Sequence, residues 1–287
     1  MKCPVCKSNR IKKLFSSKDM IISKCKNCNI MFQDESSRAL KNKELIDDIY
    51  NDYSKTIKYH LEINTERLLN IKKRTGMDLK NLDILEIGSG NGALGYLLSQ
   101  ENSYTGFEAY KILKESLLKN FPELKEKIIF SKFPPENELN KKFDLIISND
   151  TLEHTSEPVL VLSEMKKLLK PNGLIWLEIP DESFIFIKGG IRILTRMYIK
   201  GYPTNPDHRF LFTPKTFANV ARLSGLGIEK IWKESIWGNK ERLKIAIGGK
   251  LPLWISAASD IIKFLKIDMM IGANINAILK NNKNISN

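Results

Sequence analysis

Short apolar runs and helical patterns alternate along most of this 287-residue chain. Residues 82–87 form an apolar run of strand type, and a helical pattern follows at 93–98 after a glycine-rich segment. Units of strand, turn and helix build parallel sheets that carry helices on their faces. Further strand-type runs fall at 104–108, 143–148, 174–177, 228–235 and 272–280. The pattern therefore predicts an α/β domain with a doubly wound, mostly parallel sheet.

The first 35 residues follow a different pattern. Apolar and polar residues alternate at 12–16 and 20–24, which predicts a short hairpin. Two C-x-x-C pairs flank it, namely Cys3 with Cys6 and Cys25 with Cys28. Each pair lets a tight turn aim two sulfurs at one point, and four thiolates match the tetrahedral geometry of zinc. Because four thiolates leave no open coordination position, we expect a zinc ribbon with a structural zinc; the alternative is four unliganded cysteines.

A polar, charged segment connects the ribbon to the larger domain. From residue 58 to 75 the apolar positions include Leu61, Leu68 and Ile71 among charged residues, which predicts an amphipathic helix ending at Gly76. The predicted organisation is a zinc ribbon at 1–35, a helical linker at 36–75 and a catalytic domain at 76–287.

The formal net charge of +13 and the pI near 9.4 favour polyanionic partners, but the lysines are scattered along the chain. We therefore expect most of this charge on solvated helix faces. No signal peptide is visible and no run reaches the roughly 18 apolar residues of a membrane span, which predicts a cytoplasmic protein. The apolar stretch 251–267 is expected to pack on the core or a dimer face, with peripheral membrane contact as the alternative.

The glycine-rich segment carries the first candidate site. Gly88, Gly90 and Gly92 follow the strand at 82–87, so backbone N–H groups lie open to a ligand at the carboxyl edge of the sheet. The next strand ends at Glu108, 20 residues beyond Gly88, where a carboxylate can bind both ribose hydroxyls of an adenosine. With Ala93 the glycines also fit the dinucleotide pattern G-x-G-x-x-A, so their spacing alone leaves NAD open.

Four ordered segments together resemble the class I S-adenosylmethionine-dependent methyltransferases. Glu86, Gly88, Gly90 and Gly92 match the family's E/D-x-G-x-G-x-G motif; the other segments are 143–148, the Asn-Asp-Thr-Leu-Glu-His run at 149–154 and the Leu-Leu-Lys-Pro-Asn-Gly turn at 168–173. The resemblance implies a seven-stranded Rossmann-like methyltransferase fold with an antiparallel last strand. It also implies S-adenosylmethionine as cofactor, with Glu86 near its amino group and Glu108 on its ribose. The expected cofactor-binding residues are Glu86, Gly88, Ser89, Gly90, Asn91, Gly92, Glu108 and Asn149.

Methyl transfer is an in-line displacement, and a hydroxyl acceptor also needs a base. His208 lies in a loop that resembles the His and Phe-Thr-Pro segment of many methyltransferases, and it is the preferred base. His154 follows the fourth strand and is a second candidate, with a structural or cofactor-contacting role as its alternative. Asp150 or Asp207 is expected to orient the base. The candidate catalytic residues are thus His208, His154 and Asp150.

Residues 181–205 are expected to form a lid over the acceptor. Four basic residues there or nearby could bind a phosphate or diphosphate, namely Arg192, Arg196, Lys200 and Arg209. Zinc-ribbon methyltransferases of this layout suggest a small-molecule or glycan acceptor, led by a sugar or sugar nucleotide for surface polysaccharide or glycoconjugate synthesis. The alternatives are an RNA base methyltransferase, which would make nucleic acid a partner, and a non-catalytic module that keeps the cofactor fold.

Overall fold

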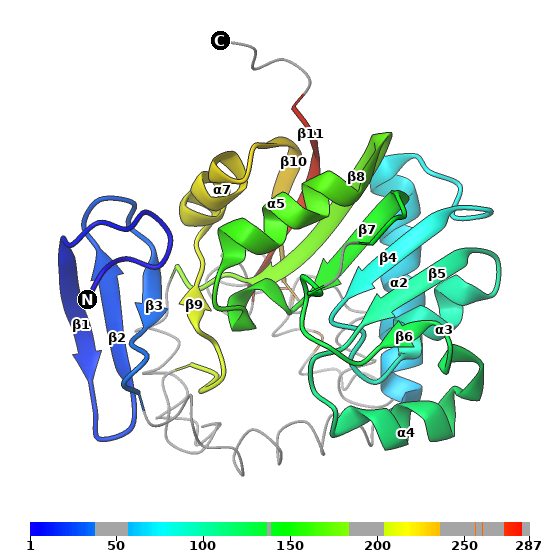
Figure 1. Ribbon diagram of the computed structural model, residues 1–287, viewed down its shortest axis with the longest axis horizontal. Helices are drawn as coiled ribbons and strands as arrows, with labels where there is room; N and C mark the ends of the chain where they lie inside the picture. The colour runs from blue at the N-terminus through cyan, green and yellow to red at the C-terminus, as the bar shows by residue number, and fades with distance from the viewer. Residues whose placement is uncertain are drawn as a thin grey trace.

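A computed structural model describes most of the chain: residues 1–37, 57–136, 139–183, 204–235, 256, 260 and 273–282. These residues form two sheets that lie side by side, with the N-terminal sheet at one end of the larger α/β layer structure (Figure 1). Most of the predicted lid and most of the apolar stretch 251–267 lie outside the described residues.

The N-terminal sheet contains the predicted hairpin. Strand β1 (Ile11–Ser16) pairs antiparallel with β2 (Ile21–Cys25), and β2 pairs antiparallel with β3 (Met31–Gln33). A fourth strand, β9 (Phe210–Leu211), comes from the larger domain and pairs antiparallel with β3. The ribbon therefore shares a continuous sheet with a segment that lies far along the chain.

The larger sheet has seven strands in the order β10-β11-β8-β7-β4-β5-β6. Strand β11 runs antiparallel to both of its neighbours, and the pairs from β8 to β6 are parallel. This topology confirms the predicted doubly wound, mostly parallel sheet with an antiparallel last strand. Its strands are β4 (Asp83–Ile87), β5 (Ser103–Phe107), β6 (Ile128–Ile129), β7 (Phe143–Asn149), β8 (Leu169–Pro180), β10 (Leu226–Ser235) and β11 (Ala273–Asn281).

Helices cover both faces of this sheet because its central strands are apolar on both sides. Neighbouring residues of one strand point to opposite faces. In β4, for example, Ile84 joins one apolar core and Leu85 the other. The helices are α2 (Ile57–Thr75), α3 (Ala93–Ser99) and α4 (Leu113–Asn120) with the short helix η2 (Pro122–Leu124) on the Ile84 side, and η3 (Leu152–His154), α5 (Pro158–Leu168) and α7 (Pro214–Leu223) on the Leu85 side.

Helix α2 confirms the amphipathic helix predicted at 58–75. It ends at Thr75, and Gly76 follows with a φ of 74°, a left-handed conformation that suits glycine at a helix end. Among the residues that the structure describes, no helix is long and apolar enough to cross a membrane.

The start of β8 differs from the sequence expectation of a turn at 168–173. Leu169 already pairs with Phe143 of β7, and a register shift follows before Leu174 pairs with Leu145. The segment between them is an irregularity within the strand, so the turn prediction was wrong. Gly173 permits it, because a Cβ there would lie 2.7 Å from the backbone oxygen of Phe143.

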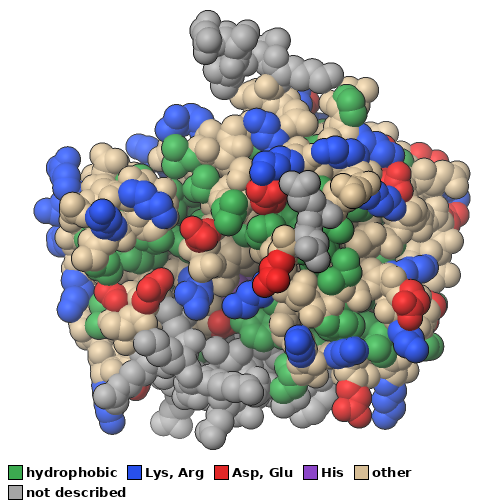
Figure 2. All heavy atoms as spheres, in the orientation of Figure 1, with side chains coloured by type: hydrophobic (Ala, Val, Ile, Leu, Met, Phe, Trp, Pro, Cys, Tyr) green, Lys and Arg blue, Asp and Glu red, His purple; other side chains and the backbone are tan. Residues whose placement is uncertain are grey.

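Lys and Arg side chains are spread over the face shown in Figure 2 and alternate with acidic side chains. Exposed ion pairs in the described structure include Lys72 with Asp78 and Lys80 with Glu101. Exposed pairs of this kind contribute little stability. The distribution on this face agrees with the expectation that much of the net charge lies on solvated surfaces.

Candidate active site

The glycine loop follows β4 at the carboxyl edge of the sheet, as predicted. Gly88, Gly90 and Gly92 all have positive φ values, of 85°, 55° and 84°. At Gly88 the neighbouring segment also forbids a side chain, because a Cβ would lie 2.0 Å from the Oγ1 of Thr151. The loop therefore needs glycine both for its backbone conformation and for its close approach to the segment after β7.

Two asparagines beside the glycine loop carry buried polar atoms that have no partner within the described protein. The Oδ1 of Asn91 accepts the N–H of Ala93 at 3.2 Å, which leaves its Nδ2 without a hydrogen bond. Asn149, at the end of β7, has a buried Oδ1 without a partner. Such atoms require an explanation, since buried polar groups are nearly always paired. A polar ligand bound at this edge supplies one, so these residues fit the predicted cofactor.

Glu86 is buried in β4 below the loop, with 4% of its surface exposed. Burial raises the pKa of this carboxyl to about 7, although the Tyr104 hydroxyl donates a hydrogen bond to its Oε2 at 2.5 Å. The Tyr104 hydroxyl also lies 3.1 Å from the Oγ of Ser89. Tyr104 therefore connects Glu86 to the glycine loop, a role that its place in a strand pattern did not reveal.

Glu108 lies where the sequence predicted an acid for the ribose. Its Oε2 accepts the N–H of Gly90 at 2.7 Å, and its Oε1 accepts the N–H of Tyr110 at 2.7 Å. Burial raises the pKa of Glu108, and these two N–H donors oppose that shift. The carboxylate is thus held against the glycine loop with both oxygens oriented.

The two candidate histidines meet although they lie far apart in the sequence. Their rings lie edge to face with centroids 4.9 Å apart. His154 belongs to η3, and its Nδ1 lies 3.0 Å from the Oδ2 of Asp207. Burial lowers the pKa of His154, but the hydrogen bond to Asp207 and the nearby Glu153 outweigh it and raise the pKa to about 9. His154 is therefore held as an imidazolium paired with Asp207.

His208 has the opposite electrostatic character. Burial lowers its pKa, and its Nδ1 lies 3.7 Å from the Oε1 of Glu182. Glu153, with 1% of its surface exposed, lies 3.9 Å from the Nε2 of His208 and 3.8 Å from the Nε2 of His154. Burial raises the pKa of Glu153 to about 8. At neutral pH the cluster thus contains a neutral imidazole beside a charged one, which suits proton acceptance by His208.

Tyr110 links the acid at the glycine loop to the histidine cluster. Its backbone N–H binds Glu108, and its hydroxyl donates to the Oδ2 of Asp207 at 2.7 Å. The two groups of candidate residues therefore form one site at the carboxyl edge of the sheet. Sequence reasoning missed Tyr110, and the only available signal was an aromatic residue two positions after Glu108.

The other predicted residues have different positions. Asp150 follows β7 with a φ of 46°, and its N–H donates to the backbone oxygen of Glu178 at 2.8 Å. Arg209 contributes backbone contacts, since its N–H donates to the oxygen of Glu153 at 2.8 Å. Three of the basic residues expected to bind phosphate lie outside the described residues, namely Arg192, Arg196 and Lys200.

Arg67 is a further candidate that sequence reasoning missed. It lies on α2, where its Nε donates to the Oε2 of Glu178 at 2.9 Å. Its positive charge also lowers the pKa of Glu86, the buried carboxyl below the glycine loop. In the fold only 12% of the Arg67 side chain is exposed. The signal available in the sequence was an arginine inside an amphipathic helix.

The four cysteines converge at one end of the ribbon. The Sγ atoms of Cys3 and Cys28 are 3.6 Å apart, as are those of Cys6 and Cys25, and all four lie within 4.8 Å of one another. A tetrahedral zinc with bonds of about 2.3 Å separates its sulfurs by about 3.8 Å, so this donor set fits the ion. Backbone N–H groups also point at two of these sulfurs: Cys6 donates to Cys3, and Asn27 donates to Cys25.

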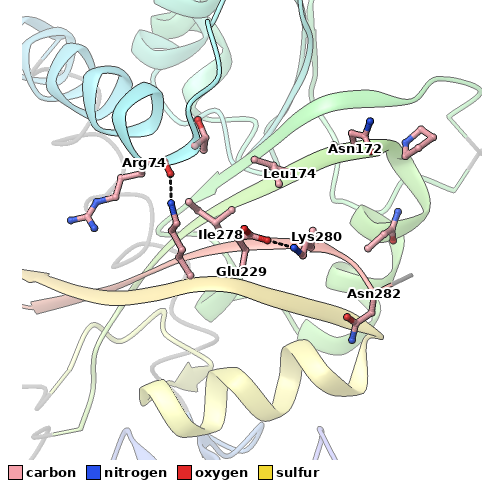
Figure 3. A pocket seen from close by; sticks show the side chains of 12 residues that line it. Arg74, Asn172, Leu174, Glu229, Ile278, Lys280 and Asn282 are labelled. Atoms are coloured by element: carbon pink, nitrogen blue, oxygen red, sulfur yellow. Dashed lines mark hydrogen bonds and ion pairs between the residues drawn. The ribbon is translucent and has the colours of Figure 1, made fainter. Parts of the chain in front are cut away.

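A cavity of about 460 Å³ lies away from this site (Figure 3). It opens beside the start of β8 and the end of β11, where Asn172 and Lys280 line it. The glycine loop lies at the opposite end of the parallel strands, so this cavity does not correspond to the predicted cofactor site. Lys280 pairs there with Glu229, and Lys230 donates to the backbone oxygen of Arg74 at 2.8 Å.

The sheet order and the glycine loop are those of the class I S-adenosylmethionine-dependent methyltransferases. A model of the methyltransferase domain family matches residues 53–231, and the chain belongs to that family. Among solved structures, a phosphoethanolamine N-methyltransferase of Haemonchus contortus, in complex with phosphomonomethylethanolamine and S-adenosylhomocysteine, has the same fold. The TM-score is 0.50 and the identity 16%, over 75% of this chain and 53% of that one.

Two curated relatives have different named functions. A ubiquinone biosynthesis O-methyltransferase of Pelagibacter ubique is 27% identical over 158 residues, which cover 53% of this chain and 65% of the relative. A tRNA U34 carboxymethyltransferase of Nautilia profundicola is 30% identical over 108 residues, which cover 36% of this chain and 35% of the relative. The chain thus spans less than two thirds of either relative.

Proposed function

We propose that this chain transfers a methyl group from S-adenosylmethionine to a hydroxyl oxygen of a small-molecule acceptor. The observation that carries the proposal is the Tyr110 link between Glu108 at the glycine loop and the Asp207 and His154 pair. The link supports the proposal because it joins Glu108, the acid we assign to the cofactor, to the histidine cluster that we assign to the acceptor. A class I fold that bound the cofactor without catalysis would not need this cluster.

The residues around the glycine loop would hold the cofactor. Glu108 presents two oriented carboxylate oxygens for the ribose hydroxyls, and the orphan polar atoms of Asn91 and Asn149 supply a further donor and acceptor. Glu86 lies close to the glycine loop, so its carboxylate, once ionised, would stabilise an ammonium group of the cofactor bound there. When bound, the cofactor supplies an electrophilic methyl group on a sulfonium sulfur.

The histidine cluster would prepare the acceptor. His208 would accept the hydroxyl proton on its neutral imidazole, while the bound cofactor would supply the methyl group to the acceptor oxygen and leave with its sulfur as the neutral thioether. The products are a methyl ether and S-adenosylhomocysteine, and the proton remains on His208 until solvent removes it. His154 and Asp207 form a charged pair that holds the loop in position and keeps the electrostatic field around His208 unchanged during the reaction. Such positioned proton acceptors typically contribute about 10²–10⁴-fold to a rate.

A sugar or sugar nucleotide is the acceptor class that we favour. This preference rests on the resemblance of the chain to zinc-ribbon methyltransferases of the same layout. The name of the Pelagibacter relative supports an oxygen acceptor. A phenol hydroxyl is therefore the main alternative to a sugar hydroxyl. The Nautilia relative, named for tRNA, keeps RNA among the acceptors to be tested. We further propose that Cys3, Cys6, Cys25 and Cys28 hold one structural zinc, since four thiolates leave it no open position.

The test uses the full, zinc-replete chain and cofactor with a labelled methyl group. Separate incubations contain sugar nucleotides, polysaccharide, catechol and other phenol acceptors, and RNA. Label in the sugar fractions supports the favoured class, label in the phenols supports ring O-methylation, and label in RNA overturns the small-molecule proposal.

Calorimetry with S-adenosylhomocysteine supplies the control that needs no acceptor. We expect binding by the wild-type chain and a loss of about 10- to 100-fold in affinity for Glu108→Ala, because a charged partner of two ribose hydroxyls is removed. Absence of binding by the wild-type chain would contradict the assigned cofactor and the proposed reaction together.

A further inference from the structure

Gln33 is the last residue of β3, and its side chain reaches from the ribbon into the active-site loop. Its Nε2 donates to the backbone oxygen of Pro206 at 2.8 Å and to that of His208 at 2.8 Å. Only 3% of the residue is exposed. The two carbonyls flank Asp207, so one amide holds the backbone on both sides of the carboxylate that pairs with His154.

The backbone of the ribbon supports the same segment. Strand β3 pairs with β9 through Met31 opposite Leu211 and Phe32 opposite Phe210. The N–H of Gln33 donates to the oxygen of Arg209 at 2.8 Å. The residues after Arg209 therefore form the outer strand of the ribbon's own sheet, and the segment 206–209 is bound to the ribbon at both of its ends.

The amide of Gln33 makes both contacts through its nitrogen, Nε2. Its Oε1 is buried without a hydrogen-bond partner among the described residues, while both N–H groups are used on loop carbonyls. A buried acceptor left unpaired is unfavourable. A residue that only filled space in the ribbon would not require such an arrangement, and a methionine of similar length would fill the same volume.

We infer that Gln33 is a positioning residue of the methyl-transfer site, through which the ribbon fixes the loop that carries Asp207 and His208. The inference rests on the proposed function, and it assigns the ribbon a task within the site. Asp207 and His208 face Glu153 and His154 from η3, Tyr110 from the segment after β5 and Glu182 from the segment after β8. A small displacement of the loop would therefore change several contacts at once.

The test compares Gln33→Met with Ser23→Ala in the full, zinc-replete chain. Methionine keeps the length and apolar volume of glutamine but has no donor for the two carbonyls. Ser23 is the matched control, because it is a fully buried polar residue of β2 opposite Phe32 and its Oγ makes no hydrogen bond in the described structure. Zinc content and the thermal midpoint are measured first, so that folded variants alone are compared.

The first readout needs no acceptor. The ring of His154 is titrated by NMR in histidine-labelled protein, with its signal assigned from His154→Gln. In the wild-type chain and Ser23→Ala we expect a pKa above the ordinary value. In Gln33→Met we expect it to fall by about one unit, since the contact with Asp207 loosens. S-adenosylhomocysteine affinity should stay within about twofold of wild type in both Gln33→Met and Ser23→Ala, because Glu108 and the glycine loop are unchanged.

The second readout is turnover with whichever acceptor pool is labelled. We expect kcat to fall about 10- to 100-fold in Gln33→Met with little change in the KM for the cofactor, as misplaced catalytic groups produce. If Gln33→Met does not fold, Gln33→Asn takes its place, because its shorter amide can reach only one carbonyl.

The two ways of failing can be separated. Wild-type protein that does not bind S-adenosylhomocysteine refutes the proposed function. Wild-type protein that binds it, with a folded Gln33→Met of unchanged His154 titration and kcat, refutes the positioning role alone.

Discussion

The Tyr110 hydroxyl donates a hydrogen bond to the Asp207 carboxylate across 97 residues of sequence. The N–H of Tyr110 binds Glu108, and Asp207 pairs with His154, so this bond joins the acid that we assign to the cofactor to the histidine cluster that we assign to the acceptor. With cofactor and acceptor bound as we propose, this hydrogen-bond chain joins the residues that hold the two molecules.

Substitution of Tyr110 by phenylalanine should remove this link and little else. We expect turnover to fall about tenfold, because Asp207 loses a donor that orients it toward His154. Affinity for S-adenosylhomocysteine, measured by calorimetry, should change less than about twofold, since the N–H of residue 110 still binds Glu108. Tyr96→Phe, on α3, is the matched control. A large loss of affinity with normal kcat would show that Tyr110 acts on the cofactor instead.

The substitution His208→Ala should abolish most turnover and leave cofactor binding intact. Loss of a positioned proton acceptor predicts a decrease of about 10²–10⁴-fold in kcat. The control His60→Ala removes a histidine from α2, outside the cluster. Turnover is followed with labelled cofactor and affinity by calorimetry. A His208→Ala protein with unchanged turnover would remove His208 from the mechanism.

Cofactor affinity should depend on pH through Glu86. Burial raises its pKa to about 7, so the carboxyl is mostly neutral about one unit below that pH and mostly ionised about one unit above it. The ionised form attracts the ammonium of S-adenosylhomocysteine, so we expect affinity to rise across this range and then to level off. In Glu86→Gln this rise should disappear. An identical pH profile in the variant would assign the dependence to another group.

Removal of one cysteine should release the metal and loosen the active-site loop. Zinc analysis of the wild-type chain should give about one ion per chain, and Cys28→Ser should retain little of it. Since β3 pairs with β9, hydrogen exchange should speed up in both strands of the variant. Ser23→Ala again serves as the control. Full zinc content in Cys28→Ser, or protection of β9 equal to wild type, would contradict this coupling.

Local patterns in the sequence determined much of the architecture. Apolar runs at 82–87 and 143–148 with intervening helical segments predicted the parallel sheet, because strands buried on both faces must be apolar throughout. The positions of Gly88, Gly90 and Gly92 predicted the sheet edge at which we propose that the cofactor binds, since glycine adopts positive φ values without steric cost. The paired cysteines likewise predicted the ribbon from spacing alone, and their sulfurs do converge.

The tertiary structure decided which distant residues meet. Nothing in the spacing of His154 and His208 indicated that their rings lie 4.9 Å apart, or that Asp207 pairs with the first and Glu182 lies beside the second. The electrostatic difference between the two histidines follows from burial and from neighbours supplied by separate elements, and no local pattern encodes these.

In the N-terminal ribbon, too, some features were predictable from the sequence and others were decided by the tertiary structure. Its sequence predicted its own fold, because the hairpin and cysteine turns are local features. Its attachment to the catalytic loop was not predictable, since the pairing of β3 with β9 and the hydrogen bonds of Gln33 join residues that are far apart in the chain. A short apolar strand carries no signal for its partner, and only the folded chain brings the two edges together.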